Sequence, residues 1–454
     1  MTEVRSSQRK LKPDIVGSEQ HEPTSLQALG NKAKADKQHR FQNLYRCLNE
    51  DLLLHCWRDL NKDAASGVDG MSAQAYAQDL HANIKALAQK LRSKSYHAKL
   101  VRRHYIPKEG SDKLRPLGIP AIEDKLVQAA CSKLLSAIYE QDFMESSYGY
   151  RPGRGALDAV YDLTGALQTG GYGYVVEADV KGFFDHLDHD KLLEMLSLRV
   201  DDRAFLSLLR KWLKAGILEP EGNILYPEAG TPQGGLVSPI LANVYLHHVL
   251  DVWFEQVVKS YCQGDVLLCR YADDWLCAFR YSKDAEAFYR VLPKRLQKFN
   301  LEVAPEKTRL LRFSRYHPSM RRRFTFLGFE FFWTEDRQGK PRVMRRTARK
   351  KLQGACRRIK EWIKLNRHLP VRKFFDGLNA RLRGHYNYYG IRGNSRALSR
   401  FYEWAKDCAF KWLNRRGGKR RSYTWERFAQ VLDIVQLARP RIFTTRYGRV
   451  MPSS

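Results

Sequence analysis

The sequence predicts an α+β protein in which a sheet-forming centre lies between helical flanks. Two short apolar runs, residues 172–179 and 266–280, have the composition of buried strands. Apolar residues recur at helical spacing on both sides of that centre, most clearly over residues 122–139 and from residue 349 onward. A chain of 454 residues is too long for one ordinary core, so we expect two to four domains.

The N-terminal part is expected to contain a tail and a helical extension. Residues 1–40 are polar, mixed in charge and poor in large apolar groups, which predicts a flexible tail. Residues 41–60 and 73–91 carry apolar residues at helical spacing, and Gly67-Val68-Asp69-Gly70 between them is typical of a turn. We therefore predict a helical N-terminal extension over residues 41–100.

Strands and helices are both expected in the central region. A polar turn over residues 109–112 separates two extended runs within residues 101–120, which predicts a hairpin. The other elements expected are a helix at 122–139, a strand at 172–179 that ends in Asp179, helices at 190–200 and 205–213, and two strands within 266–280 joined at Ala272-Asp273-Asp274. Beyond residue 349 helices dominate, with breaks expected at Gly384, Gly390 and Gly393.

Charge is distributed unevenly along the chain. Lys and Arg total 79 against 49 acidic residues, a formal net charge of +30, and residues 341–454 alone hold 30 basic and 6 acidic residues. Aromatic residues such as Trp362, Tyr402 and Trp412 are interleaved with those cations, as in surfaces that stack bases of single-stranded or irregular RNA. The last quarter therefore indicates nucleic-acid binding, although charge alone also fits a ribosome-like or membrane-surface protein.

The eight cysteines do not indicate a metal site or a disulfide framework. They lie at positions 47, 56, 131, 262, 269, 277, 356 and 408, and none forms a Cys-x-x-Cys pair. No run of apolar residues reaches the roughly 18 needed for a membrane span, and the N-terminus has no apolar signal region. We expect a cytoplasmic protein with reduced thiols and no membrane partner.

Acidic residues in two places have the pattern of a metal-dependent transferase. Phosphodiester synthesis uses two hard cations, and Mg²⁺ prefers carboxylate oxygens on rigid elements. Asp179 closes an apolar strand, while Asp273 and Asp274 occupy a hairpin turn, so neighbouring strands of one sheet would bring all three together. Taken singly, each has an ordinary alternative as a turn residue or a helix cap.

These acids belong to a series of motifs that resembles the reverse transcriptases. The motifs, in chain order, are Tyr148-Gly149-Tyr150-Arg151-Pro152-Gly153, Glu177-Ala178-Asp179-Val180-Lys181-Gly182-Phe183-Phe184-Asp185, Thr231-Pro232-Gln233-Gly234-Gly235, Tyr271-Ala272-Asp273-Asp274, Pro305-Glu306-Lys307-Thr308 and Phe326-Leu327-Gly328-Phe329. The resemblance implies a right-hand polymerase, with fingers and an antiparallel palm sheet over residues 101–340. Two adjacent phenylalanines after Asp179 argue against an RNA-templated RNA polymerase.

Finer motifs resemble the bacterial group II intron branch of that family. They are Gly67-Val68-Asp69-Gly70, Gly384-His385-Tyr386-Asn387-Tyr388-Tyr389 and Trp425-Glu426-Arg427-Phe428. This resemblance implies a basic helical thumb or maturase domain (domain X) over residues 341–422 and a short DNA-binding tail over residues 423–454. The paired cysteines and histidines of the C-terminal endonuclease found in many relatives are not present, so we expect the chain to lack bottom-strand cleavage.

The resemblance also implies roles for the acids and their neighbours. Asp179, Val180, Asp273 and Asp274 would hold two Mg²⁺ ions, for which Mn²⁺ can substitute, with Asp179 and Asp273 as the essential pair. Lys307 would be the general acid that protonates pyrophosphate, and its alternative is a solvated loop cation. The His186-Leu187-Asp188-His189-Asp190 run is expected to be structural, with Asp188 or Asp190 capping a helix.

Nucleotide and primer contacts follow from the same motifs. The residues implied to bind the dNTP are Lys113, Arg115, Val180, Phe183, Phe184, Gln233 and Gly234. Of the two rings, Phe184 is the better candidate to exclude a ribose 2′-hydroxyl, with Phe183 in the core. Tyr271, Leu327 and Gly328 would contact the primer and template, although Tyr271 is equally compatible with a cross-strand core position.

The thumb is expected to bind RNA. The residues implied are Arg345, Arg346, Arg349, Lys350, Arg381, Arg383, His385 and Tyr386, with packing inside a helix as the alternative for the last two. The expected partners are an RNA template, a group II intron RNA, a DNA primer or target and dNTPs, and the protein would be a monomer or a dimer near the nucleoid. Two other functions fit the sequence: a splicing-only maturase with a silent polymerase site, and a host-adopted reverse transcriptase in phage defence or DNA repair.

Overall fold

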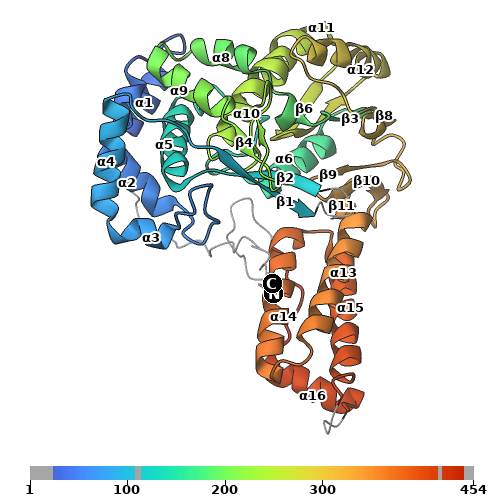
Figure 1. Ribbon diagram of the computed structural model, residues 1–454. Coiled ribbons are helices and arrows are strands. Elements are labelled where there is room, and N and C mark those ends of the chain that lie inside the picture. Colours follow the sequence, from blue (N-terminus) through green and yellow to red (C-terminus); the bar gives the residue numbers. More distant parts are fainter. Residues whose placement is uncertain (1–23, 108–113, 418–421, 444–454) are drawn as a thin grey trace.

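The chain folds into a broad body and a helical arm. A computed structural model describes residues 24–107, 114–417 and 422–443. In Figure 1 the body holds the sheets and most of the helices, and the arm projects from it. The helices of the arm are α13 (Arg349–Asn366), α14 (Val371–Tyr389), α15 (Ser395–Leu413) and α16 (Trp425–Val435). This arrangement confirms the α+β class with a helical C-terminal region.

The N-terminal extension is helical and begins earlier than predicted. Its elements are α1 (Thr24–Ala35), η1 (Leu44–Cys47), α2 (Glu50–Asp59), α3 (Ala73–Gln78) and α4 (Leu80–Arg92). The prediction of a flexible tail over residues 1–40 is wrong over α1, which packs on α5 (Ile122–Tyr139) and buries Leu26 and Ala33. A helix that docks through only Leu26, Leu29 and Ala33 shows almost no apolar pattern, so the sequence did not reveal it.

The palm sheet is antiparallel and buried on both faces. Its strands lie in the order β6 (Val266–Tyr271), β7 (Asp274–Phe279), β3 (Tyr174–Asp179) and β8 (Arg309–Arg312). Along β7, Trp275, Cys277 and Phe279 enter one hydrophobic cluster, while Leu276 and Ala278 enter another. Because both faces are covered, the strands are continuous apolar runs and not alternating patterns.

Two smaller sheets complete the body. The predicted fingers hairpin is confirmed as β1 (Val101–Pro107) and β2 (Leu114–Ile119), which extend through β4 (Ile217–Leu218) and β5 (Ile224–Leu225). The hairpin turn and Lys113 lie outside the described residues. The third sheet contains β9 (Arg323–Phe326), β10 (Phe329–Glu335) and β11 (Pro341–Thr347). Since β11 pairs with β10, the predicted boundary at residue 341 falls inside a hairpin, and the arm begins at Arg349.

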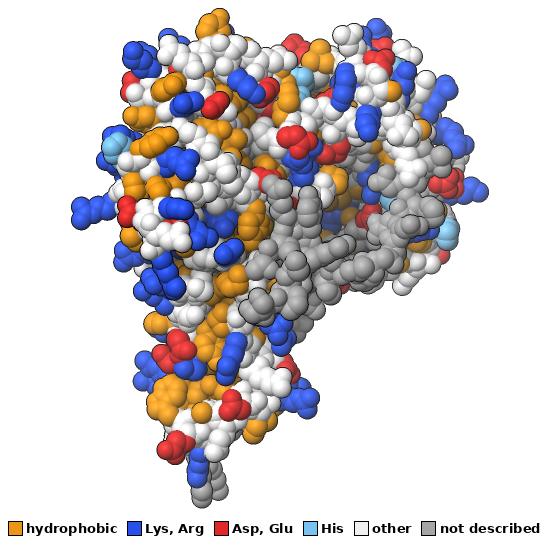
Figure 2. All heavy atoms as spheres, turned by 180° about the vertical axis from the view of Figure 1, so that it is seen from behind, with side chains coloured by type: hydrophobic (Ala, Val, Ile, Leu, Met, Phe, Trp, Pro, Cys, Tyr) orange, Lys and Arg blue, Asp and Glu red, His pale blue; other side chains and the backbone are white. Residues whose placement is uncertain are grey.

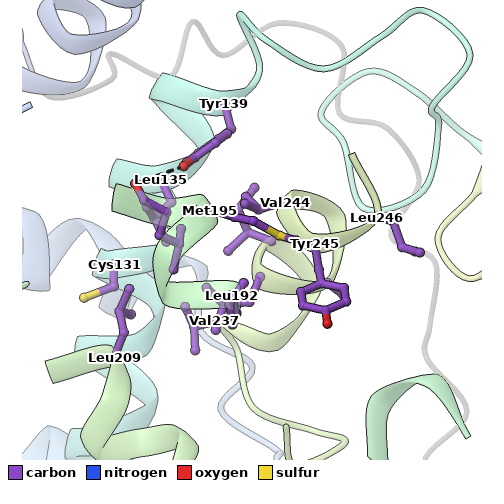
Figure 3. Close-up of a cluster of buried hydrophobic side chains, with 14 of the residues drawn as sticks. Cys131, Leu135, Tyr139, Leu192, Met195, Leu209, Val237, Val244, Tyr245 and Leu246 are labelled. Atoms are coloured by element: carbon purple, nitrogen blue, oxygen red, sulfur yellow. Dashed lines mark hydrogen bonds between the residues drawn. The ribbon is translucent and has the colours of Figure 1, made fainter. Parts of the chain in front are cut away.

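Helices cover the sheets and form the largest core. The remaining helices of the body are α6 (Ala156–Thr169), α7 (Phe183–His186), α8 (His189–Ser197), α9 (Arg203–Leu213), α10 (Ser238–Leu246), η2 (His247–Asp251), η3 (Phe254–Val258), α11 (Lys259–Tyr261), α12 (Ser282–Gln297) and η4 (Pro305–Lys307). Figure 3 shows Leu135, Leu192, Leu209 and Val244, from α5, α8, α9 and α10, packed together. Burying each such side chain contributes roughly 1.5–3 kcal/mol to the free energy of folding. These contacts hold together the helices on which the palm sheet packs.

The arm differs from its prediction at two places. Gly384 lies inside α14 and does not break it, whereas Gly390 ends that helix and Gly393 lies in the turn that follows. The expected separate tail from residue 423 packs on the arm as far as it is described, since Phe428 is fully buried there. Within the described residues, no helix combines the length and the apolarity that crossing a bilayer requires.

Candidate active site

Sheet register brings the three predicted acids to one edge of the palm. Asp179, the last residue of β3, lies directly opposite Asp274, the first residue of β7. Asp273 occupies the turn between β6 and β7, beside Ala272, whose φ is +56°. Burial raises the pKa of both Asp273 and Asp274, and the charge of Asp179 raises both further. Two segments 94 positions apart in the chain therefore form one acidic cluster.

Burial and mutual repulsion both disfavour the ionised forms of these carboxyl groups. Desolvation by the surrounding protein, followed by the charges of Asp273 and Asp179, raises the pKa of Asp274 to about 7. Asp274 remains accessible to solvent at the end of its strand. The pKa of Asp273 is also raised, by desolvation first and by the Asp179 charge, while Arg115 lowers it. Like charges held this close are stabilised by bound cations.

Lys307 already contacts one of the acids. Its Nζ lies 2.5 Å from Oδ2 of Asp179, and this hydrogen bond raises the pKa of Lys307. The lysine, at the end of η4, is therefore held in its charged form beside the acids. A metal ion bound to the same Asp179 oxygen would compete with the lysine for it.

The Pro-Gln-Gly loop is fastened to the fingers by backbone contacts. The Gly118 N–H in β2 donates to the Gln233 carbonyl at 2.7 Å, and the Thr231 N–H donates to the Phe184 carbonyl at 2.8 Å. Gly234 has a φ of +119°, and a Cβ there would lie 2.4 Å from the Gly118 carbonyl oxygen. Only glycine fits this approach, and the loop thereby contacts β2 of the fingers hairpin on one side and Phe184 on the other.

Burial distinguishes the two phenylalanines after Asp179. Phe183 is 2% exposed and belongs to the main hydrophobic cluster. Phe184 is half-buried and meets the Phe183 ring edge-on at 5.3 Å. The nucleotide role given to Phe183 is therefore contradicted by its burial, whereas Phe184 keeps part of its ring accessible.

A two-residue turn joins the acids to the arm. Leu327 and Gly328, both with positive φ, connect β9 and β10, as in hairpin turns of type I′. The Leu327 carbonyl accepts a hydrogen bond from the Tyr388 hydroxyl at 2.8 Å, and the Leu327 backbone lowers the pKa of Asp274. Tyr271 packs partly buried in the cluster that contains this turn. The predicted primer residues thus lie between the palm and the start of the thumb.

Comparison with known proteins accounts for these motifs. The family model described as "Reverse transcriptase (RNA-dependent DNA polymerase)" matches residues 106–331, and that described as "Group II intron, maturase-specific domain" matches residues 352–429. Protein YkfC of Escherichia coli (strain K12) is 31% identical over 309 residues, which cover 61% of this chain and 78% of that protein. The chain belongs to the reverse transcriptases encoded by group II introns.

Two further relatives match over a shorter part of this chain. Group II intron-encoded protein LtrA of Lactococcus lactis subsp. cremoris is 40% identical over 215 residues, which cover 46% of this chain and 35% of LtrA. An uncharacterized 91 kDa protein in the cob intron of Schizosaccharomyces pombe is 36% identical over 222 residues, covering 48% of this chain and 27% of that protein. The alignments thus span about a third of the length of these two relatives.

The residues present fit the divalent metal on which reverse transcriptase domains depend. Val180 and Val303 form an isolated antiparallel bridge. Its two hydrogen bonds run from the Lys181 N–H to the Glu302 carbonyl and from the Ala304 N–H to the Asp179 carbonyl, so neither bond uses the Val180 carbonyl. Hard oxygens of Asp179, Asp273 and Val180 suit such an ion. Among the described residues no position is enclosed by three or more side-chain ligands. An ion here would therefore take one or two carboxylates and complete its shell with water and substrate oxygens.

Several predicted RNA contacts of the reverse transcriptase thumb are buried. Arg345 is 8% exposed and packs over the Tyr161 ring, and Arg346 is ion-paired with Glu330 at 2.6 Å. Tyr386 is buried, and His385, which lies 3.9 Å from the Phe401 ring, has its pKa lowered to about 4 by burial. The structure therefore supports the packing alternative for both, and it contradicts a surface role for Arg345.

The thumb aromatics also differ from the expected stacking surface. Arg381 covers the Trp362 ring at 4.2 Å, and Lys364, Arg367 and Arg415 approach the Trp412 ring. These cations occupy the rings that were expected to stack bases. Among the predicted RNA contacts, Arg349, Lys350 and Arg383 are exposed, and Arg383 lines a hollow of about 690 Å³ together with Tyr402, Arg439 and Arg441. Figure 2 shows Lys and Arg side chains spread over body and thumb in the view from behind.

Other sequence signals acquire a structural explanation. Asp188 caps α8 by accepting from the Lys191 N–H at 2.9 Å, and His189 contacts the Gly230 carbonyl at 2.6 Å, so this run is structural, as predicted. Sequence reasoning missed Arg270, Asp251 and Asn243, which meet in a buried polar network under the acids. An arginine inside the apolar run Val266–Tyr271 was the available signal, because an interior charge needs dedicated partners.

Proposed function

We propose that the chain is an RNA-directed DNA polymerase that adds dNTPs to a primer 3′-hydroxyl with two Mg²⁺ ions, for which Mn²⁺ can substitute. The observation that carries the proposal is the register of Asp179 opposite the Asp273-Asp274 turn. When bound, such ions activate the attacking hydroxyl and neutralise the leaving pyrophosphate. Asp179, Asp273 and the Val180 carbonyl would hold them, Arg115 would orient the triphosphate, and Lys307 would donate a proton to pyrophosphate.

Metal-dependent primer extension tests the proposal. The full chain should extend a DNA primer on an RNA template with dNTPs and Mg²⁺, and chelation with EDTA should stop extension, because carboxylates that repel one another cannot orient substrate without a cation. Product length on a sequencing gel is the measurement. Extension that persists in EDTA, or no extension with either Mg²⁺ or Mn²⁺, would contradict the proposal.

Sugar selection should depend on one ring. Phe184→Ala is expected to lower discrimination against ribonucleotides by roughly 10–100-fold, because the half-buried ring fills space beside the nucleotide sugar. Incorporation of dNTPs and rNTPs would be compared by kcat/KM. Phe183→Ala is the matched control: it should cost about 3–5 kcal/mol of stability and leave selectivity unchanged, since that ring lies in the core. The reverse result would exchange the two assignments.

We further propose that the thumb binds group II intron RNA and promotes its splicing, on the basis of the maturase-specific match and its exposed cations. Replacing Arg349, Lys350 and Arg383 with glutamine should weaken RNA binding. It should also reduce the magnitude of the slope of log K against log salt by about 2, because each lost phosphate contact lowers that magnitude by roughly 0.7–0.9.

Filter binding over a range of KCl concentrations would measure this slope. Replacing Lys283, Arg290 and Lys294, three exposed cations of α12, with glutamine removes the same charge from the body and serves as the control. Equal slopes for both triple variants would show that net charge alone binds RNA and would reject a thumb site.

A further inference from the structure

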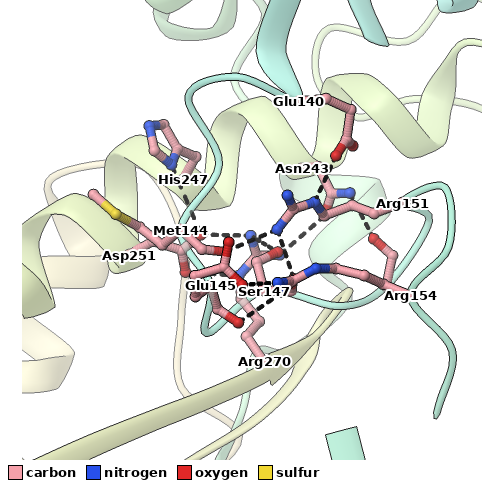
Figure 4. A network of polar contacts seen from close by, with 11 residues as sticks. Glu140, Met144, Glu145, Ser147, Arg151, Arg154, Asn243, His247, Asp251 and Arg270 are labelled. Atoms are coloured by element: carbon pink, nitrogen blue, oxygen red, sulfur yellow. Dashed lines mark hydrogen bonds and ion pairs between the residues drawn. The ribbon is translucent and has the colours of Figure 1, made fainter. Parts of the chain in front are cut away.

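A fully buried arginine lies directly beneath the catalytic turn. Arg270 is 0% exposed in β6 and precedes Tyr271, Ala272 and Asp273 in the chain. All five of its guanidinium N–H donors have partners. Nε and Nη2 donate to the two carboxylate oxygens of Asp251 at 2.7 and 2.5 Å, Nη2 donates to Ser147 Oγ at 2.7 Å, and Nη1 donates to Asn243 Oδ1 at 3.0 Å and to the Ala272 carbonyl at 3.1 Å. Figure 4 shows Asn243, Ser147 and Asp251 gathered around Arg270.

One of these bonds acts on the backbone that carries Asp273. The Ala272 carbonyl belongs to the peptide group that joins Ala272 to Asp273, so the bond from Arg270 fixes the orientation of that peptide. Ala272 has a φ of +56°, a region that residues other than glycine rarely adopt. Such a conformation persists only where the surroundings impose it, and Arg270 supplies part of that constraint.

The same turn is confined from its other side by Gly149. A Cβ at Gly149 would lie 2.3 Å from the Ala272 backbone nitrogen, so no larger residue fits without moving the turn. Asn243 links the two sides, because its Nδ2 donates to the Gly149 carbonyl at 2.7 Å while its Oδ1 accepts from Arg270. Backbone hydrogen bonds at 2.8 Å also join Arg270 to Ser146 and Tyr148 on this segment.

Stability alone does not explain a charged pair at this position. Arg270 and Asp251 are both fully shielded from solvent, and a buried pair of this kind generally contributes little more than apolar residues of the same volume would. What apolar residues cannot provide is a directional hold on a carbonyl. The residues of the network lie on rigid elements: Arg270 in β6, Asp251 at the end of the π-helical η2 and Asn243 in α10.

We propose that Arg270 is a positioning residue for nucleotidyl transfer, which, backed by Asp251, Asn243 and Gly149, fixes the Ala272–Asp273 peptide and so aims the Asp273 carboxylate. The inference rests on the polymerase function proposed above. Lysine cannot replace the arginine, because a single ammonium does not reach five acceptors arranged around a planar fork.

Kinetics of two variants test the proposal from both sides of the turn. Arg270→Lys keeps the charge and loses the fork, while Gly149→Ala pushes on Ala272. Both should lower kcat by about 100-fold, the effect of displacing a reacting group by about 1 Å, with little change in KM for the dNTP. The Mg²⁺ concentration for half-maximal rate should rise, because Asp273 no longer faces the ion. A general loss of folding would not separate kcat from KM in this way.

Matched controls address folding. Arg199→Lys alters another buried arginine, which is ion-paired with Asp142 at 2.9 Å away from the turn, and Gly165→Ala adds a methyl group where no atom lies within 4 Å. Arg199→Lys should lower the melting temperature as Arg270→Lys does, while kcat stays at the parent value. If Arg270→Lys does not fold, Ser147→Ala, which removes one acceptor from the fork, and Gly149→Ala still test the proposal.

Metal binding gives a readout independent of catalysis. Mn²⁺ added to the full chain without substrates would be followed by electron paramagnetic resonance, with Asp273→Ala as the background. Arg270→Lys and Gly149→Ala should weaken Mn²⁺ binding by about tenfold, the size of a disturbed supporting shell. Folded variants with parental kcat and parental Mn²⁺ affinity would overturn the proposal. A parent that binds Mn²⁺ more tightly than these variants but never extends a primer would instead reject the polymerase function and leave the positioning role standing.

Discussion

Replacing Asp273 with alanine is expected to lower primer extension by at least about 10³-fold, because it removes a carboxylate that would hold metal where several kcal/mol of transition-state charge is stabilised. The same change relieves repulsion at the site. Desolvation and the neighbouring carboxylates raise the pKa of Asp274 to about 7 and also raise that of Asp273, so these acids oppose folding when they are ionised at neutral pH. Single-turnover extension and thermal unfolding without metal would be measured together.

A loss of rate combined with an unchanged or higher melting temperature would identify Asp273 as a functional residue. Asp190→Ala removes an exposed acid, paired with Arg210 on the body, and serves as the control that should keep the parental rate. RNA binding should persist in Asp273→Ala, because the proposed RNA contacts lie on the thumb. Undiminished primer extension by Asp273→Ala would reject the assignment of this site. The acids would then no longer distinguish a polymerase from a splicing-only maturase.

Gly234→Ala is expected to lower both stability and catalysis, because two penalties coincide at this position. The φ of +119° is strained for any residue with a Cβ, and that Cβ would lie 2.4 Å from the Gly118 carbonyl oxygen. We expect a loss of about 2–4 kcal/mol of stability and a fall in kcat of about 100-fold, as the Pro-Gln-Gly loop moves away from β2. Chemical denaturation and steady-state kinetics would measure the two effects.

Gly222→Ala separates strain from contact. Gly222 has a φ of +92°, but no atom lies within 4 Å of a Cβ built there. This variant should lose about 1–2 kcal/mol from backbone strain and retain the parental kcat. If Gly234→Ala retains the parental kcat as well, the close approach of the loop to the fingers has no role in nucleotide binding.

Local sequence patterns predicted the elements that carry the acids. The hairpin at β1 and β2, the helix Ile122–Tyr139 and the strand pair around Ala272-Asp273 all follow from apolar periodicity and turn residues. Asp179 and Asp273 could be placed at strand ends for the same reason. The motif resemblance was needed to pair them, since periodicity does not say which strands are neighbours.

Burial among distant segments decided the rest. The sequence treats Arg345 and Arg349 alike, yet one packs over Tyr161 and the other is exposed, because only the fold sets α6 against β11. The choice between Phe183 and Phe184, and the docking of α1, depend on contacts of the same kind. By itself the sequence determined the local conformations and the chemical groups available. The network around Arg270 required the tertiary structure, because its side-chain partners Ser147, Asn243 and Asp251 lie on two segments remote from β6 in the chain.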